Sequence, residues 1–165
     1  MRRCFPNDVL MKTSDSVAIR GEYGRIFGLA ANVEEWARIL PHYRYVKLLR
    51  RDGNRKLVKM SAWRDMIPVT WTAVETVVPG TESDPGRITF HHVRGLVRGM
   101  DVEWSFQVRH GTGDVLVTIS HDLEHPRFPV KILGPRLTDV IVGKGFVSYI
   151  AGKTLHQIKM LVEEK

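Results

Sequence analysis

The chain has 165 residues, of which 43% are hydrophobic and 26% are charged, and its formal net charge is +7. These values are typical of a soluble globular protein with a buried core, and no apolar run reaches the roughly 18 residues that span a bilayer. The basic N-terminus has no apolar segment behind it, which argues against a secretory signal, so we expect a cytoplasmic protein.

The N-terminal residues differ from the rest of the chain. We expect residues 1–10 to be a disordered extension and residues 11–165 to form a single domain, and translation could start at Met1 or at Met11. The single cysteine, Cys4, excludes an intrachain disulfide. This fits a reducing compartment.

The first part of the domain is expected to form one strand and two short helices. The strand covers residues 12–20, and the first helix covers 23–31. Asn32 is expected to cap the second helix, over 33–39, because its side chain can accept a hydrogen bond from a first-turn N–H group. Pro41 ends this helix, since proline cannot continue the hydrogen-bonding pattern.

Strands with clear alternation of apolar and polar residues follow. In 98–109, for example, Met100, Val102, Trp104, Phe106 and Val108 share one face. Such alternation buries one side of a strand. The expected strands cover residues 43–51, 55–65, 67–78, 87–94, 98–109 and 114–124. Turn signals such as Asp52-Gly53 lie between them and predict an antiparallel meander.

A long helix is expected over residues 137–163. Its helically spaced apolar residues are Leu137, Val140, Ile141, Val147, Ala151, Leu155, Ile158 and Val162. Gly143, Gly145 and Gly152 interrupt it. They either give space for the sheet or a ligand to come close, or they allow a kink near Gly143. A sheet that wraps this helix would leave a wedge-shaped pocket between them.

This order of elements resembles the START/SRPBCC superfamily of helix-grip proteins. Within it, the chain is most similar to the polyketide cyclase/aromatase-like branch, which includes coenzyme Q-binding proteins. The segments that carry the resemblance are Glu35-Trp36-Ala37-Arg38-Ile39-Leu40-Pro41-His42-Tyr43, Trp63-Arg64 before Ile67-Pro68-Val69, Gly99-Met100 with Val102 and Trp104, and Ser120-His121-Asp122.

The resemblance implies an α+β fold in which a curved, antiparallel, seven-stranded sheet wraps a long C-terminal helix, with two short helices after the first strand. It also implies that Arg64 matches a pocket arginine of the aromatase/cyclases, which holds polyketide carbonyls, and that Trp36 and Tyr43 line the same pocket. The superfamily hosts cyclases, dehydratases, lipid carriers and ribosome-associated proteins, so the resemblance leaves the activity open.

Arg64 is the first candidate catalytic residue. It follows Met60 and Ala62 with strand periodicity, so its guanidinium is expected to enter an apolar cavity. There it would need an acceptor such as a ligand carbonyl or carboxylate. The alternative is an ion pair with Asp65 or another carboxylate at the rim of the sheet.

His121 is the second candidate. It shares a strand face with Ile119, and because histidine titrates near neutral pH it could serve as a general acid or base. The alternative is a core histidine that is hydrogen-bonded to the backbone or to an acid.

Glu75 shares a strand face with Trp71. If it points inward, it could bind Arg64 or a hydroxyl group of the ligand. The alternative is that it lies on the face of the sheet that contacts solvent.

A set of large side chains is predicted to bind a hydrophobic ligand. These residues are Trp36, Tyr43, Met60, Trp71, Phe90, Met100, Trp104 and Phe106. The alternative is that they form ordinary core. His91 and His92 are adjacent on a strand and therefore point to opposite faces, and no Cys/His spacing suggests zinc. We expect no cofactor and no metal.

Basic residues cluster in one predicted hairpin. Residues 1–60 carry 13 Lys/Arg and 6 Asp/Glu, whereas residues 61–165 carry 12 of each. The basic residues of the hairpin are Arg44, Lys47, Arg50, Arg51, Arg55, Lys56 and Lys59. They either attract an acidic partner such as RNA or simply solvate a sheet edge.

The sequence therefore predicts a protein that binds a polyketide-, quinone- or lipid-like molecule between the sheet and the C-terminal helix. If it is an enzyme, the expected chemistry is aldol-type cyclisation and dehydration. The alternatives are a non-catalytic lipid or quinone carrier, a ribosome- or RNA-associated module that uses the basic hairpin, and an interaction domain whose wedge is filled by its own side chains. A monomer and a homodimer are both compatible with the sequence.

Overall fold

The computed structural model describes residues 11–123 and 144–164 of the chain. Its elements are β1 (Met11–Arg20), α1 (Tyr23–Ala31), the 3-10 helix η1 (Val33–Glu35), α2 (Trp36–Ile39), β2 (Tyr43–Asp52), β3 (Arg55–Arg64), β4 (Ile67–Val78), β5 (Arg87–Gly95), β6 (Asp101–Arg109), β7 (Asp114–Leu123) and α4 (Lys144–Glu163). The expected strands are confirmed, with small shifts at their ends. The expected first turns of the long helix, over 137–143, lie outside the described residues.

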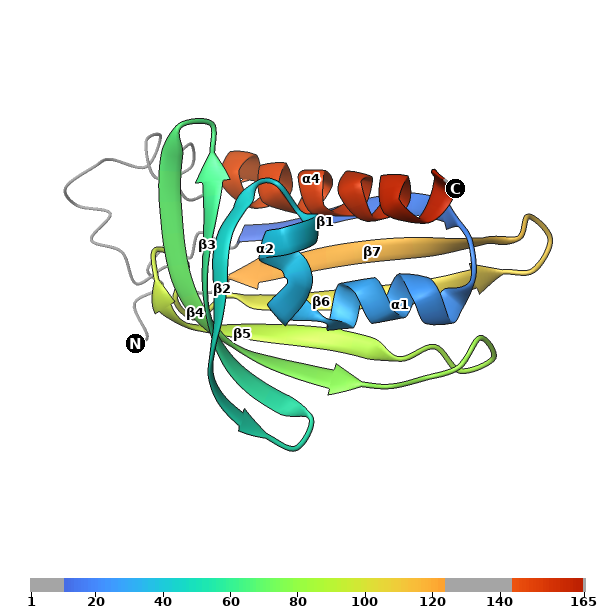
Figure 1. The fold of residues 1–165 in the computed structure, drawn as a ribbon, viewed down its shortest axis with the longest axis horizontal. Coiled ribbons are helices and arrows are strands. Elements are labelled where there is room, and N and C mark those ends of the chain that lie inside the picture. Colours follow the sequence, from blue (N-terminus) through green and yellow to red (C-terminus); the bar gives the residue numbers. More distant parts are fainter. Residues whose placement is uncertain (1–10, 124–143, 165) are drawn as a thin grey trace, which may run out of the picture.

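The strands form one antiparallel sheet in the order β1-β7-β6-β5-β4-β3-β2. The two-residue turns after Asp52 and Arg64 use left-handed backbone at Gly53 (φ 58°) and Asp65 (φ 53°), as the right-handed twist of hairpin strands requires. Figure 1 shows that β3 and the adjoining part of β4 run steeply across the direction of β1, β6 and β7, and that β4 then bends to run beside β5. The sheet is therefore strongly curved, with α4 lying along its concave side, and the expected fold class is confirmed.

Helix α4 is fixed to the start of the domain by polar contacts near its C-terminal end. Lys159 Nζ donates to the Ala18 carbonyl at 2.8 Å, and Arg25 Nη2 donates to the Leu161 carbonyl at 2.7 Å. A Cβ atom at Gly21 would lie 2.5 Å from Val162 Cγ1, so only glycine lets the chain pass this close to the helix. These contacts hold the C-terminal half of α4 against β1 and α1.

One local expectation is wrong, and one of the two alternatives for the helix glycines does not hold at Gly152. Asn32 makes no side-chain capping hydrogen bond, because its backbone (φ −89°, ψ 67°) departs from the extended conformation of a capping residue. The second helix is instead a 3-10 turn that leads into a single α-turn. Gly145 and Gly152 are exposed, and a Cβ atom at Gly152 would meet nothing within 4 Å, so Gly152 does not make room for the sheet. Gly143, the position of the alternative kink, lies outside the described residues.

Within the described residues, no helix combines the length and the apolar character that crossing a bilayer requires.

Candidate ligand-binding cavity

A cavity of about 60 Å³ lies between the inner face of the sheet and helix α4. The space between its lining atoms, with the solvent at its mouth included, is about 530 Å³. Helix α4 contributes Phe146, Val147, Ile150, Ala151 and Thr154 to one side. The sheet, α2 and the β5–β6 connection supply the other sides, so the cavity occupies the wedge that the sequence predicts.

Most of the predicted ligand-binding residues meet in this cavity. The lining includes Trp36, Tyr43, Met60, Trp71, Phe90, Met100 and Trp104, together with His121. They converge because each lies on the buried face of its element, and strand alternation turns that face toward α4. Their role in binding stays a prediction.

Two predicted residues lie elsewhere. Phe106 packs against Phe27 of α1, with ring centroids 5.1 Å apart, and against Tyr23, so it belongs to the core beneath that helix. Arg64 is half-buried at the end of β3 and is not among the residues that line the cavity. It is four residues beyond Met60, about 13 Å along a strand, so it lies near the turn rather than inside the cavity.

Trp36 is the centre of the aromatic wall. Its ring centroid lies 5.3 Å from that of Tyr43, 5.7 Å from that of Phe90 and 5.6 Å from that of Trp104. Its Nε1–H donates to the Leu29 carbonyl at 3.1 Å, which fixes the orientation of the indole. The wall therefore offers flat apolar surfaces whose positions are set by packing and by one hydrogen bond.

A buried hydrogen bond that the sequence did not predict joins His42, directly before β2, to Thr154 of α4. The Thr154 hydroxyl donates to the Ile150 carbonyl at 2.8 Å and lies 2.9 Å from His42 Nε2. Because the hydroxyl proton is already used, His42 Nε2 must carry the proton and donate to Thr154. Burial, with a smaller contribution from Lys153, lowers the pKa of His42 to about 4, so the imidazole is neutral at pH 7.

His121 lines the cavity from β7. Its Nδ1 lies 3.2 Å from the Thr13 hydroxyl of β1. Burial lowers its pKa to about 4, so the ring is uncharged at neutral pH. A neutral imidazole is a weak proton donor, and this environment favours hydrogen bonding to a ligand over general acid catalysis.

His92 is another cavity residue outside the set predicted from the sequence. Its neighbour His91 is exposed and lies 2.6 Å from Asp101 Oδ1, whereas His92 is buried and lines the cavity, as opposite strand faces require. The sequence contains a signal for this position, because His92 is two residues from Phe90 on the same strand and therefore shares its buried face. Thr154 was detectable in the same way, because it lies one turn beyond Ala151.

Glu75 faces inward, away from solvent, but is not among the residues that line the cavity. Lys56 Nζ lies 3.3 Å from Glu75 Oε2 and 3.1 Å from Glu34 Oε2, so one ammonium serves two carboxylates. Burial raises the pKa of Glu75 to about 7, although Lys56 acts in the opposite direction. Neither Arg64 nor a cavity ligand is needed to explain this inward acid.

Within the described residues, no Asp, Glu, Lys or Arg side chain lines the cavity. Its polar groups are hydroxyl, indole and imidazole groups, and the lowered pKa values of His92 and His121 make those imidazoles neutral. The arrangement can hold an apolar molecule and offer it a few hydrogen bonds, which is the usual composition of a small-molecule site.

Solved structures with the same fold extend over nearly the whole chain. The Zhui aromatase/cyclase from Streptomyces sp. R1128 has a TM-score of 0.76 at 16% identity and covers 94% of this chain and 94% of its own. A START superfamily protein from Mycobacterium smegmatis has a TM-score of 0.67 at 13% identity, with 93% of this chain and 97% of its own covered.

One similar structure is twice as long. The di-domain aromatase/cyclase BexL from the BE-7585A biosynthetic pathway has a TM-score of 0.79 at 18% identity, and the match covers 97% of this chain but 52% of BexL. No curated protein matches the chain significantly in sequence. At these identities the structural likeness establishes the fold alone.

Family membership follows from the sequence itself. The model of the family described as "Polyketide cyclase / dehydrase and lipid transport" matches residues 23–142, which is more than half of the chain. The matched region includes every residue of the sheet that lines the cavity. The chain therefore belongs to the polyketide cyclase/dehydrase and lipid transport family.

Proposed function

We propose that this protein binds a flat hydrophobic molecule of the polyketide, quinone or lipid type in the cavity beneath α4. The observation that carries the proposal is the cavity itself, with an aromatic wall around Trp36 and no charged side chain among its described lining residues. The aromatase/cyclases among the similar structures support a ring-bearing ligand in particular.

The cavity must widen to hold such a ligand. Drug-sized ligands occupy pockets of about 300–1,000 Å³, whereas this cavity is about 60 Å³. The N-terminal end of α4 lines the cavity with Phe146, Val147 and Ile150. The hydrogen bonds that join α4 to Ala18 and Arg25 lie near the C-terminal end of the helix. We therefore expect binding to move the N-terminal half of α4 away from the sheet.

The environment of the cavity favours binding over proton transfer. The described lining has no carboxylate, and its histidines have pKa values below the range in which a general acid works near neutral pH. If the protein also cyclises its ligand, holding a folded chain against the aromatic wall is the contribution this site can make. Arg64, near the β3–β4 turn, would then contact only a ligand that extends beyond the cavity.

A substitution that fills the cavity tests the proposal. Ala151→Leu adds three carbon atoms at a buried position of α4 that lines the cavity. The neutral fluorescent probe N-phenyl-1-naphthylamine is expected to bind the wild-type protein and to bind Ala151→Leu at least about tenfold more weakly. Fluorescence titration measures both affinities.

The matched control is Gly152→Leu. It places the same side chain at the next residue of α4, where a Cβ atom has open space around it. This variant should bind the probe with wild-type affinity. Equal weakening by both substitutions, or none by Ala151→Leu, would place the probe outside the cavity and count against the proposal.

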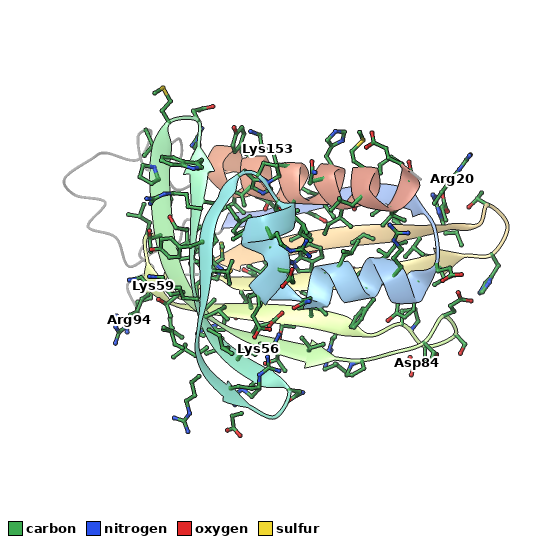
Figure 2. The ribbon with its side chains drawn as sticks, viewed as in Figure 1. Arg20, Lys56, Lys59, Asp84, Arg94 and Lys153 are labelled. Atoms are coloured by element: carbon green, nitrogen blue, oxygen red, sulfur yellow. The ribbon has the colours of Figure 1, made fainter. Side chains whose placement is uncertain are left out.

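A second candidate function rests on the outer face of the basic hairpin. Arg51 and Lys56 contact Glu34 at 2.8 and 3.1 Å, so at least two of the seven basic residues are held in internal ion pairs. Lys59 and Arg94 line one groove on the outer side of the sheet and lie close together in Figure 2. Their charges, with the other basic residues of β2 and β3, suit a polyanion such as RNA.

Salt dependence tests this candidate. The double variant Lys47→Gln/Lys59→Gln should bind a structured RNA more weakly than wild type, and its salt dependence should fall by roughly two counterions. Lys153→Gln, on α4, removes the same kind of charge from a different face and should change neither quantity. Wild-type RNA binding that is absent, or that is equally reduced by Lys153→Gln, would count against a specific basic face.

A further inference from the structure

Two polar ring atoms in the cavity wall have no hydrogen-bond partner among the described residues. Trp71 of β4 and His92 of β5 are 6% and 5% exposed, and both line the cavity. Trp71 Nε1 and His92 Nδ1 are each buried without a partner. Buried polar groups are nearly always paired in folded proteins, so two unpaired atoms on residues that line one cavity need an explanation.

The two atoms belong to one structural unit. The rings of Trp71 and His92 are stacked, with centroids 6.0 Å apart and planes 5° from parallel. A bulge between Thr72 and Ala73 shifts the register of β4 against β5, so that Trp71 pairs with Gly95 and His92 pairs with Ala73. This irregularity allows both rings to face the same cavity.

The main-chain groups of His92 are already hydrogen-bonded to other residues, so the unpaired ring nitrogen is not explained by an unpaired main chain. The His92 N–H donates to the Met100 carbonyl at 2.9 Å, and the His92 carbonyl accepts from the Gly99 N–H at 2.8 Å. The main chain of His92 is therefore fully paired, whereas its ring Nδ1 is not. By contrast, the indole of Trp36 in the same wall has its Nε1–H paired with the Leu29 carbonyl.

The chemistry of the two atoms selects a neutral partner. The indole N–H is a neutral donor, and burial lowers the pKa of His92 to about 3, so its ring is uncharged and its Nδ1 either donates or accepts. A carbonyl oxygen could accept from both nitrogens, and a hydroxyl could accept from the indole and donate to the imidazole. A carboxylate would lose its hydration without gaining a cation, because no charged side chain is among the described residues of the lining.

We infer that Trp71 Nε1 and His92 Nδ1 form a polar anchor that binds one neutral oxygen, a ketone, quinone or phenol group, of a ring-bearing ligand. The anchor rests on the proposed function and refines it, because it names the functional group that the ligand presents. It gives the cavity a fixed polar point against which the apolar part of the ligand is oriented along the aromatic wall.

Three probes that differ only in their polar group test the anchor. Calorimetric titration of the wild-type protein with naphthalene, 2-naphthol and 2-naphthoate should show 2-naphthol binding about tenfold more tightly than naphthalene, with 2-naphthoate the weakest. Trp71→Phe and His92→Leu keep apolar side chains in place and remove one nitrogen each. Each should reduce the preference for 2-naphthol over naphthalene severalfold.

Phe90→Leu is the control, because it changes the lining of the cavity without removing a polar atom. It should weaken naphthalene and 2-naphthol equally and leave their ratio unchanged. In the wild-type protein, the NMR signal of the Trp71 indole N–H should shift on addition of 2-naphthol more than on addition of naphthalene. This signal tests the anchor even if a variant fails to fold.

The outcomes separate the anchor from the cavity. If the wild-type protein binds naphthalene and 2-naphthol equally, or if both variants keep the preference, the anchor is wrong while the cavity remains a binding site. If the wild-type protein binds none of the three probes, both the anchor and the proposed function are contradicted.

Discussion

Trp36→Ala is expected to lower the free energy of unfolding by about 3–5 kcal/mol, the range for removing a large buried aromatic side chain. Trp36 is 3% exposed and contacts the rings of Tyr43, Phe90 and Trp104. Its loss would leave a hole where α2, the sheet and the cavity meet. Urea denaturation of the wild-type and variant proteins measures the difference.

Trp36→Phe separates the ring packing from the hydrogen bond. It keeps an aromatic ring but removes the donor to the Leu29 carbonyl, so the expected loss is about 1–2 kcal/mol. A loss below 1 kcal/mol for Trp36→Ala would show that the aromatic wall can collapse around the deletion. In that case the aromatic wall would not be a preformed surface for a ligand.

Acidification is expected to destabilise the protein steeply. Burial lowers the pKa values of His42 and His121 to about 4 and that of His92 to about 3, from an ordinary value of 6.5. The unfolded chain therefore binds these protons more readily than the folded protein. The buried, uncharged histidines therefore make their full contribution to the free energy of unfolding above pH 6.5. This contribution is lost as the pH falls toward 4.

Glu75 acts in the opposite direction. Its pKa is raised to about 7 from 4.5, so the folded protein holds this proton more tightly than the unfolded chain. Its contribution to stability increases as the pH falls from 7 to 4.5. Between pH 6.5 and 4.5, three histidines against one glutamate leave a net uptake of roughly two protons on unfolding, which corresponds to a slope of roughly 2.7 kcal/mol per pH unit.

Denaturation curves at several pH values measure this slope. His92→Leu should reduce it by about one proton, or roughly 1.4 kcal/mol per pH unit, because it removes one of the three titrating groups. Glu75→Gln should make it steeper by a similar amount. A profile that is flat between pH 6.5 and 4.5, or a slope that neither substitution changes, would mean that these side chains are hydrated in the folded protein.

The sheet was largely predictable because its signals are local. Alternation in residues 98–109 and turn residues such as Asp52-Gly53 each depend on a few neighbouring positions, and the strands appear where these patterns place them. The helix cap was not predictable, because Asn32 has a capping side chain but also ends α1, where its N–H donates to the Gly28 carbonyl and its backbone conformation is not that of a capping residue. Side-chain type alone does not determine that conformation.

The cavity was predictable in its walls but not in its polar groups. Strand parity brings Trp71 and Trp104 to the same side, and both line the cavity. Parity identifies the buried face of a strand but not which part of that face lines the cavity, and Arg64 and Phe106 lie on the inward face outside the cavity. The pairing of His42 with Thr154 joins residues 112 positions apart, so no local pattern could reveal it.

Native mass spectrometry of the protein purified from its own organism tests the central claim most directly, with wild type and Ala151→Leu analysed side by side. The wild-type protein should carry a bound organic molecule, and extraction should identify it as a ring-bearing polyketide-, quinone- or lipid-like compound. The variant, whose leucine fills the cavity, should be free of it. Wild-type protein without a bound molecule, or equal retention by both proteins, would contradict a ligand site beneath α4.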